Sequence, residues 1–292
     1  MSRGRQGAAI GSFVIGAVCS TLAAALLRFR PPGGAGRWTR NNHAGRPVTL
    51  FEGPAYTAGA VAGALAGGAG ASVAVAGLGA AAFGALDDLV DGSARKGLRG
   101  HLAAACSGEV TTGTIKVLGL SATGLLSARM IDRSRGSNGA VATLVGGAVI
   151  AGSANIANLL DLRPGRALKV VLLLAAPIAA GAGKSDLDAA SLTATAAAGG
   201  AAGAAIGALA GDLRGQSMLG DTGANSAGAL LGTALVARAG PRGRLLALAV
   251  VTAVTLASER VSFTKVIEST PGLRELDALG RPSWSSPPAS QK

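Results

Sequence analysis

Long apolar runs with few charges follow one another along almost the whole chain, and this pattern constrains the fold more than any other feature. The runs lie at 8–27, 56–86, 111–128, 139–157, 168–182, 192–209, 226–237 and 245–257. The run at 56–86 is too long for one comfortable span. The glycines between Gly67 and Gly70 predict a bend that divides it into two short helices.

Backbone groups cannot stay unpaired in lipid, and these runs are too long and too little alternating for barrel strands. We therefore expect an all-α, polytopic integral membrane protein with nine to ten transmembrane helices. Residues 1–265 would form a single transmembrane domain and residues 266–292 a cytoplasmic C-terminal tail. The composition agrees, because 14% of the residues are charged, against about 25% in soluble domains. The many small residues suit close helix packing and a homodimer, although they single out no dimer face.

The formal net charge of +12 does not indicate nucleic acid, because no basic stripe with interleaved aromatic residues is present. With nine spans, 17 Lys and Arg residues fall on one side of the membrane and 9 on the other. The richer side is expected to be cytoplasmic, in a multi-pass protein of the plasma membrane. Cys19 and Cys106 stand far apart without Cys or His partners, so neither a disulfide framework nor a zinc site is expected.

The acidic motifs all fall on the richer side. They are Asp87-Asp88 with Asp91, the segment from Asn155 through Asn158 to Asp161, and Asp221 in a Gly-Asp-Thr-Gly turn. Carboxylates are the ligands that Mg²⁺ prefers, together with substrate phosphates. The sequence therefore predicts that Asp221 holds Mg²⁺, or Mn²⁺ in its place. The neighbouring cations Lys96, Arg99, Arg163 and Arg166 would hold phosphate oxygens.

Simpler interpretations exist for each residue. Asp221 or Thr222 would serve well as the N-cap of the following helix, and the acids at 87–91 would be stable as solvated loop residues. For Lys116 we expect a side chain that extends from its helix to the membrane surface. His43 and His101 are expected to be solvated loop residues.

The order Asp-Asp-x-x-Asp, Asn-x-x-Asn-Leu-x-Asp and Gly-Asp-Thr-Gly, each after an apolar run, resembles the polyprenyl-phosphate N-acetylhexosamine-1-phosphate transferases. The resemblance covers roughly residues 40–265. It implies a helical membrane enzyme that uses magnesium to move a sugar-1-phosphate from a UDP-sugar to a polyprenyl phosphate at the cytoplasmic face, for cell-envelope glycan assembly. Asp87 and Asp88 match the catalytic pair, as general base or as nucleophile in an aspartyl-phosphate route, and Asp221 matches the metal ligand. Asn155, Asn158 and Asp161 match the loop that lines the nucleotide-sugar site.

Two departures keep a second function class open. Pro164 stands where the family has a further Asp, and no His follows His101, although the family has a histidine-containing loop. A catalytically impaired relative that binds a lipid-linked precursor or an envelope-assembly partner is therefore the alternative. A small-solute transporter is disfavoured, because the polar groups gather on one face and not at the midplane.

Overall fold

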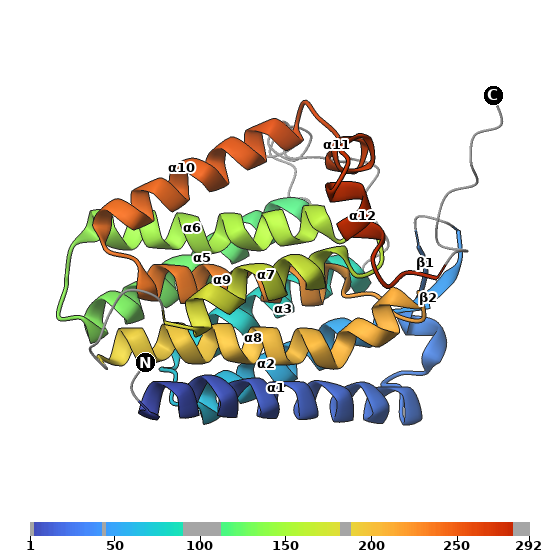
Figure 1. Ribbon diagram of the computed structural model, residues 1–292, viewed down its shortest axis with the longest axis horizontal. Helices are drawn as coiled ribbons and strands as arrows, with labels where there is room; N and C mark the ends of the chain where they lie inside the picture. The colour runs from blue at the N-terminus through green and yellow to red at the C-terminus, as the bar shows by residue number, and fades with distance from the viewer. Residues whose placement is uncertain (1–2, 43–44, 90–111, 182–187, 283–292) are drawn as a thin grey trace.

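The computed structural model describes residues 3–42, 45–89, 112–181 and 188–282, and its regular structure is helical apart from two short strands (Figure 1). The elements are α1 (Arg3–Phe29), η1 (Ala35–Trp38), β1 (Thr39–Asn41), β2 (Pro47–Thr49), α2 (Glu52–Ala66), α3 (Ser72–Leu89), α5 (Thr112–Ser134), α6 (Ala140–Leu160), α7 (Arg166–Ala179), α8 (Ala189–Leu213), α9 (Gly220–Arg238), α10 (Pro241–Ser258), α11 (Phe263–Ser269) and α12 (Leu273–Ala278). The all-α class predicted from the sequence is confirmed. Each predicted apolar run overlaps a helix, and the bend predicted at the 67–70 glycines separates α2 from α3.

Six described helices are long and apolar enough to cross a membrane, so the chain is a multi-pass membrane protein. They are α1 from Gln6 onward, α3, α5, α6, α8 and α10. The expected number of nine to ten is not confirmed. A span needs about 20 residues, whereas α2 has 15 and α7 has 14. The 19 residues of α9 include polar side chains along its length, such as Asn225 and Thr233.

The outer surface of the bundle is apolar. On α1, Ile10, Val14, Val18, Leu22 and Leu26 follow each other at intervals of four residues, and each is more than half exposed. A continuous apolar stripe of this kind is costly in water and matches the hydrocarbon of a bilayer. These side chains therefore face lipid.

The interior is made of small residues, and α8 and α9 lie at its centre. Nearly every residue of α9 is buried. A Cβ at Gly203 on α8 would lie 2.0 Å from the carbonyl oxygen of Phe13 on α1. Only glycine permits such an approach of two helix backbones. The Ala- and Gly-rich composition is thus used to bring helix axes close together.

One end of the bundle carries β1, β2 and the C-terminal helices, and most polar residues discussed below lie there (Figure 1). β1 pairs antiparallel with β2, with Thr39 opposite Thr49. Thr49 also accepts a 3.0 Å hydrogen bond from Met218 N, just before α9. The Arg40 guanidinium donates to the carbonyl of Asp88 at 2.6 Å. The hairpin, which the sequence did not lead us to expect, therefore ties the start of α9 to the end of α3.

Candidate functional site

Asp88 at the end of α3 completes the first turn of α9. Its Oδ1 accepts from the backbone N–H of Asp221 at 3.0 Å. Its Oδ2 accepts from the N–H of Thr222 at 2.8 Å and from the Thr222 hydroxyl at 2.6 Å. A helix begins with N–H groups that lack partners inside the helix, and a carboxylate also matches the positive end of the dipole. The cap of α9 is therefore Asp88 and not Asp221 or Thr222, whose capping roles we had considered.

Asp87 and Asp221 meet at a single lysine. The ammonium of Lys116, on the first turn and a half of α5, contacts Asp221 Oδ2 and lies 3.7 Å from Asp87 Oδ2. The Lys116 side chain is 13% exposed, compared with 36% for Asp87 and 23% for Asp221. Two carboxylates thus share one cation in a partly desolvated place. The expectation that Lys116 extends to the membrane surface is wrong, because its side chain points to these two acids.

Glycines allow this convergence. A Cβ at Gly84 would lie 2.3 Å from the carbonyl oxygen of Asp221, so α3 and α9 touch through their backbones one turn below Asp88. Gly220 begins α9 with φ +60°, which side chains other than glycine rarely adopt. The sequence singled out the Gly-Asp-Thr-Gly turn around Asp221, and the structure shows how closely α3 approaches that turn.

Asp161 follows the last turn of α6 on the same end of the bundle. It is 9% exposed, and its Oδ2 has no hydrogen-bond partner among the described residues. Burial, followed by the negative charge of Asp212, raises the pKa of Asp161 well above its usual range. The charge of Asp221 acts in the same direction. Asp161 is therefore electrostatically linked to the acids at the start of α9.

The other residues predicted to bind substrate are placed only in part. Asn155 and Asn158 are half-buried on α6, and neither side chain makes a hydrogen bond within the part of the chain that the structure describes. Asp91, Lys96 and Arg99 lie outside the described residues. Their roles stay predictions.

Two buried acids near the site were not singled out from the sequence. Glu52, the first residue of α2, is 3% exposed, and its Oε2 accepts from the Ser217 hydroxyl at 2.6 Å. Asp212, in the last turn of α8, is 2% exposed and accepts from the backbone N–H of Gly165 at 3.0 Å. Their positions at helix ends, next to apolar runs, are the sequence signal that was available for both.

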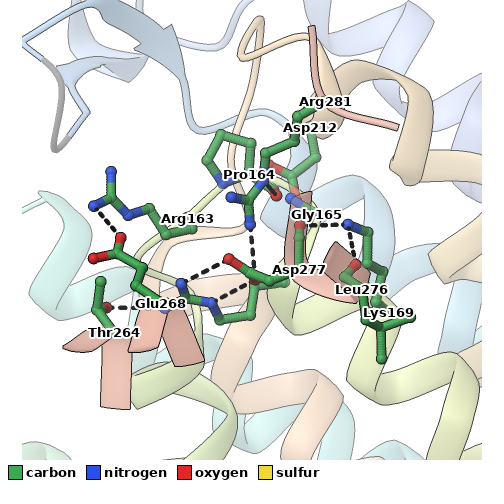
Figure 2. Close-up of polar contacts among 11 residues, drawn as sticks. Arg163, Pro164, Gly165, Lys169, Asp212, Thr264, Glu268, Leu276, Asp277 and Arg281 are labelled. Carbon is green, nitrogen blue, oxygen red and sulfur yellow. Dashed lines mark hydrogen bonds and ion pairs between the residues drawn. The ribbon is translucent and has the colours of Figure 1, made fainter. Parts of the chain in front are cut away.

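Arg163 and Arg166, predicted to flank the phosphates, are paired with the C-terminal segment. Figure 2 shows Arg163 beside Glu268. Arg163 contacts Glu268 at 2.8 Å. Arg166 binds Asp277 through two bonds of 2.8 and 3.0 Å and donates to the Thr264 hydroxyl. These guanidinium groups hold α11 and α12 against the α6–α7 turn.

An apolar groove of about 580 Å³ runs between α6, α7, α9 and α10. Leu160 lines it near Asp161, and Ile178 and Leu235 line it towards the other end of the bundle. Small residues such as Ala157 and Gly228 widen it. Its apolar lining suits hydrocarbon.

The chemistry of the donor set fits magnesium. Asp87 and Asp221 both face the Lys116 ammonium, and both offer the hard oxygen ligands that Mg²⁺ takes. Within the described ranges, no group of three or more His, Cys, Asp or Glu residues is placed to hold a metal ion. Mg²⁺ commonly uses only one or two carboxylates, with water and substrate phosphates as its other ligands.

Comparison with known proteins adds no family to this geometry. No protein-family model and no curated protein matches the chain. The likeness to the polyprenyl-phosphate sugar-1-phosphate transferases rests on the three motifs. The structure shows a multi-pass helical protein with a carboxylate–lysine cluster at one end.

Proposed function

We propose that the protein is a transferase that moves a sugar-1-phosphate from a UDP-sugar to a polyprenyl phosphate. The observation that carries this proposal is the meeting of Asp87 and Asp221 at Lys116, next to Asp161. Such a mixed cluster recognises a diphosphate with a divalent cation, since lysine and carboxylate-bound metal both neutralise phosphate charge. The groove that begins at Leu160 supplies a place for the prenyl chain.

The two members of the Asp87–Asp88 pair receive different roles. Asp88 accepts three hydrogen bonds from the start of α9 and is a positioning residue. Asp87 is 36% exposed and faces Lys116, so we assign it as the general base for the acceptor phosphate. The acceptor oxygen forms a bond to the phosphorus that carries the sugar, and the bond from this phosphorus to the bridging oxygen breaks. UMP leaves with that electron pair.

Lys116 contributes charge stabilisation. Its ammonium lies between the two carboxylates and donates to phosphate oxygens as negative charge builds up on them. When bound, magnesium would be held by Asp221 with Asp87 beside it, and it would neutralise the diphosphate. An aspartyl-phosphate route through Asp87 uses the same groups, and hydroxylamine cleavage of trapped, labelled protein distinguishes the two.

The excess of Lys and Arg at this end supports a cytoplasmic active site in the plasma membrane. A UDP-sugar made in the cytoplasm then reaches the cluster directly.

The test uses purified full-length protein with radiolabelled UDP-N-acetylhexosamines, undecaprenyl phosphate and magnesium. Wild type is expected to release UMP and form a lipid-linked product, and Asp221→Asn and Asp87→Asn to form none. Asp188→Asn is the matched control. Asp188 caps α8 by accepting from Ser191 N at 2.6 Å, and Asn caps equally well. The proposal is lost if no donor gives product or if Asp221→Asn transfers as fast as wild type.

The pairing of Lys116 with both acids also favours a second function, the binding of a lipid-linked precursor without turnover. The two carboxylates already have a cation supplied by the protein itself, as in a purely structural ion pair. Retention of polyprenyl phosphate without UMP release under any donor would select this alternative.

A further inference from the structure

The end of α5 and the starts of α6 and α10 lie at the end of the bundle remote from β1 and β2 (Figure 1). A second pocket, with charged residues in its lining, is found there. It has a volume of about 370 Å³ and is formed by the end of α5 and the starts of α6 and α10. Asp132, Arg135 and Arg244 line it, together with Val145 and Leu245. None of these residues takes part in the proposed transfer reaction.

The floor of this pocket is a buried ion pair. Arg244 Nη1 lies 2.7 Å from Asp132 Oδ1, and the two side chains are 4% and 2% exposed. Asp132 Oδ2 accepts from the Thr143 hydroxyl at 2.8 Å, so both oxygens of Asp132 are engaged. Arg244 Nη2 is buried and has no partner among the described residues. A buried guanidinium N–H without an acceptor is costly, so the charge of Arg244, which lines the pocket, is only partly satisfied by Asp132.

Arg135 adds a positive charge. Its guanidinium donates to the carbonyl oxygens of Ala237 and Ala239 at the end of α9, the latter at 3.1 Å. The ion pair of Asp132 and Arg244 is neutral as a unit, whereas Arg135 forms no ion pair within 4 Å in the described part of the chain. The residues that line the pocket therefore carry one net positive charge, which the carboxylate of Asp188, outside the lining, partly offsets.

Two helices begin at the pocket. Val141 and Ala142 belong to the first turn of α6, and Pro241 is the first residue of α10. The N-cap residues Gly139 and Gly240 have no side chain that could accept from the first N–H groups. Both positive helix ends therefore add to the attraction for an anion.

The remaining wall is apolar and continues into the lipid-facing surface. Val141 is 72% exposed and Leu245 is 56% exposed. Their neighbours Leu144 on α6 and Leu246 on α10 are 58% and 67% exposed. A ligand that fits has an anionic head and hydrocarbon next to it, which a free inorganic anion lacks.

We propose that this pocket binds the phosphate of an anionic phospholipid headgroup, with the acyl chains lying along the exposed faces of α6 and α10. The site is independent of the transferase reaction and tethers the start of α10 to the membrane surface opposite the carboxylate cluster.

The test is native mass spectrometry of the full-length protein released from micelles that contain phosphatidylglycerol and phosphatidylcholine in equal amounts. Wild type is expected to retain phosphatidylglycerol about tenfold more than phosphatidylcholine, roughly 1.4 kcal/mol, because the choline cation of phosphatidylcholine offsets its phosphate and is repelled by the pocket arginines, whereas phosphatidylglycerol has a net negative charge. Arg135→Gln removes one of the two positive charges that line the pocket, and Val145→Phe fills the pocket without touching any charge. Both are expected to lose this preference.

Two matched controls distinguish an effect of the pocket itself from an effect of changes on the nearby surface. Arg242→Gln removes an exposed charge on the same turn of α10, and Leu144→Phe enlarges an exposed side chain on α6. Both should retain phosphatidylglycerol like wild type. Phosphatidylglycerol should also raise the melting temperature of wild type and not that of Val145→Phe, which shows that the variant folds and lacks the site.

Three results would overturn the proposal. These are equal retention of the two lipids by wild type, unchanged retention by Val145→Phe, and full displacement of the lipid by millimolar inorganic phosphate. The last result would assign the pocket to a soluble anion.

Discussion

Asp88 on α3 binds both the backbone N–H and the hydroxyl of Thr222 on α9, at 2.8 and 2.6 Å. Two helices separated by more than 130 residues in the sequence are thus joined by one carboxylate. The same carboxylate holds the Asp221 N–H and so fixes the backbone of the proposed metal ligand.

Asp88→Asn should lower stability more than Asp87→Asn. The amide cannot accept on both of its terminal atoms, and the loss of a helix cap costs about 0.5–2 kcal/mol. Asp87→Asn leaves the Asp88 cap of α9 in place, so it should lower the unfolding midpoint in denaturant less than Asp88→Asn does, and it should abolish transfer. Equal midpoints for the two variants would contradict the division of roles.

Lys116→Gln should destabilise the protein by about 2 kcal/mol, because it leaves two close carboxylates without their shared cation. Adding Asp221→Asn should restore part of this loss, since the remaining repulsion is then removed. A double-mutant cycle on unfolding free energies should give a coupling of about 1–3 kcal/mol between Lys116 and Asp221. A coupling near zero would mean that the contact contributes nothing.

Gly84→Ala should separate α3 from α9 and cost about 1–3 kcal/mol, as overpacking does. The added Cβ meets the backbone of Asp221, which cannot rotate away, so transfer should fall as well. Gly11→Ala on α1 is the matched control, because no atom lies within 4 Å of its added Cβ. That variant should be neutral or gain up to about 1 kcal/mol from better helix propensity.

Arg166→Gln should release α11 and α12 from the bundle. The residue supplies three hydrogen bonds to this segment (Figure 2), and trypsin should then cleave at Lys265 and Arg274 much faster than in wild type. Arg274→Gln removes only the exposed pair with Glu275, so the remaining Lys265 site should stay as protected as in wild type. Equal protection of Lys265 in Arg166→Gln would show that the segment docks by other means.

The docking of α12 should also depend on pH in a defined direction. Burial alone would raise the pKa of Asp277, but the hydrogen bond from Arg166 and the charges of Arg281 and Arg166 outweigh it and lower the pKa below its usual 3.8. Because docking lowers the pKa of Asp277, its ionised carboxylate stabilises the docked state at pH values above the usual pKa. This stabilisation is lost as the pH falls through the lowered pKa. Hydrogen exchange of residues 273–278 should therefore stay slow at pH 5 and increase only below about pH 3.8. An increase near neutral pH would assign the docking to another group.

The sequence predicted the helices well because length and hydropathy decide whether a segment spans lipid. It also predicted that Asp87, Asp161 and Asp221 share one end, because alternation of the helices fixes the side on which each turn lies. It did not predict the direction of Lys116, because a lysine in an apolar helix reaches the surface or a buried acid equally well, depending on neighbours distant in sequence. The sequence did not predict the separate roles of Asp87 and Asp88 either. Adjacent residues on a helix point about 100° apart, and the sequence does not show which of the two directions faces α9.

The cap that Asp88 provides has a consequence for the order of assembly. During synthesis α3 is made well before α9, and the first turn of α9 gains its acceptor only when the two helices meet across the intervening segments. Asp221 is held in place by the same event. A half-inserted chain therefore lacks this arrangement of Asp88 and Asp221, so the proposed chemistry would be restricted to protein whose membrane integration is complete.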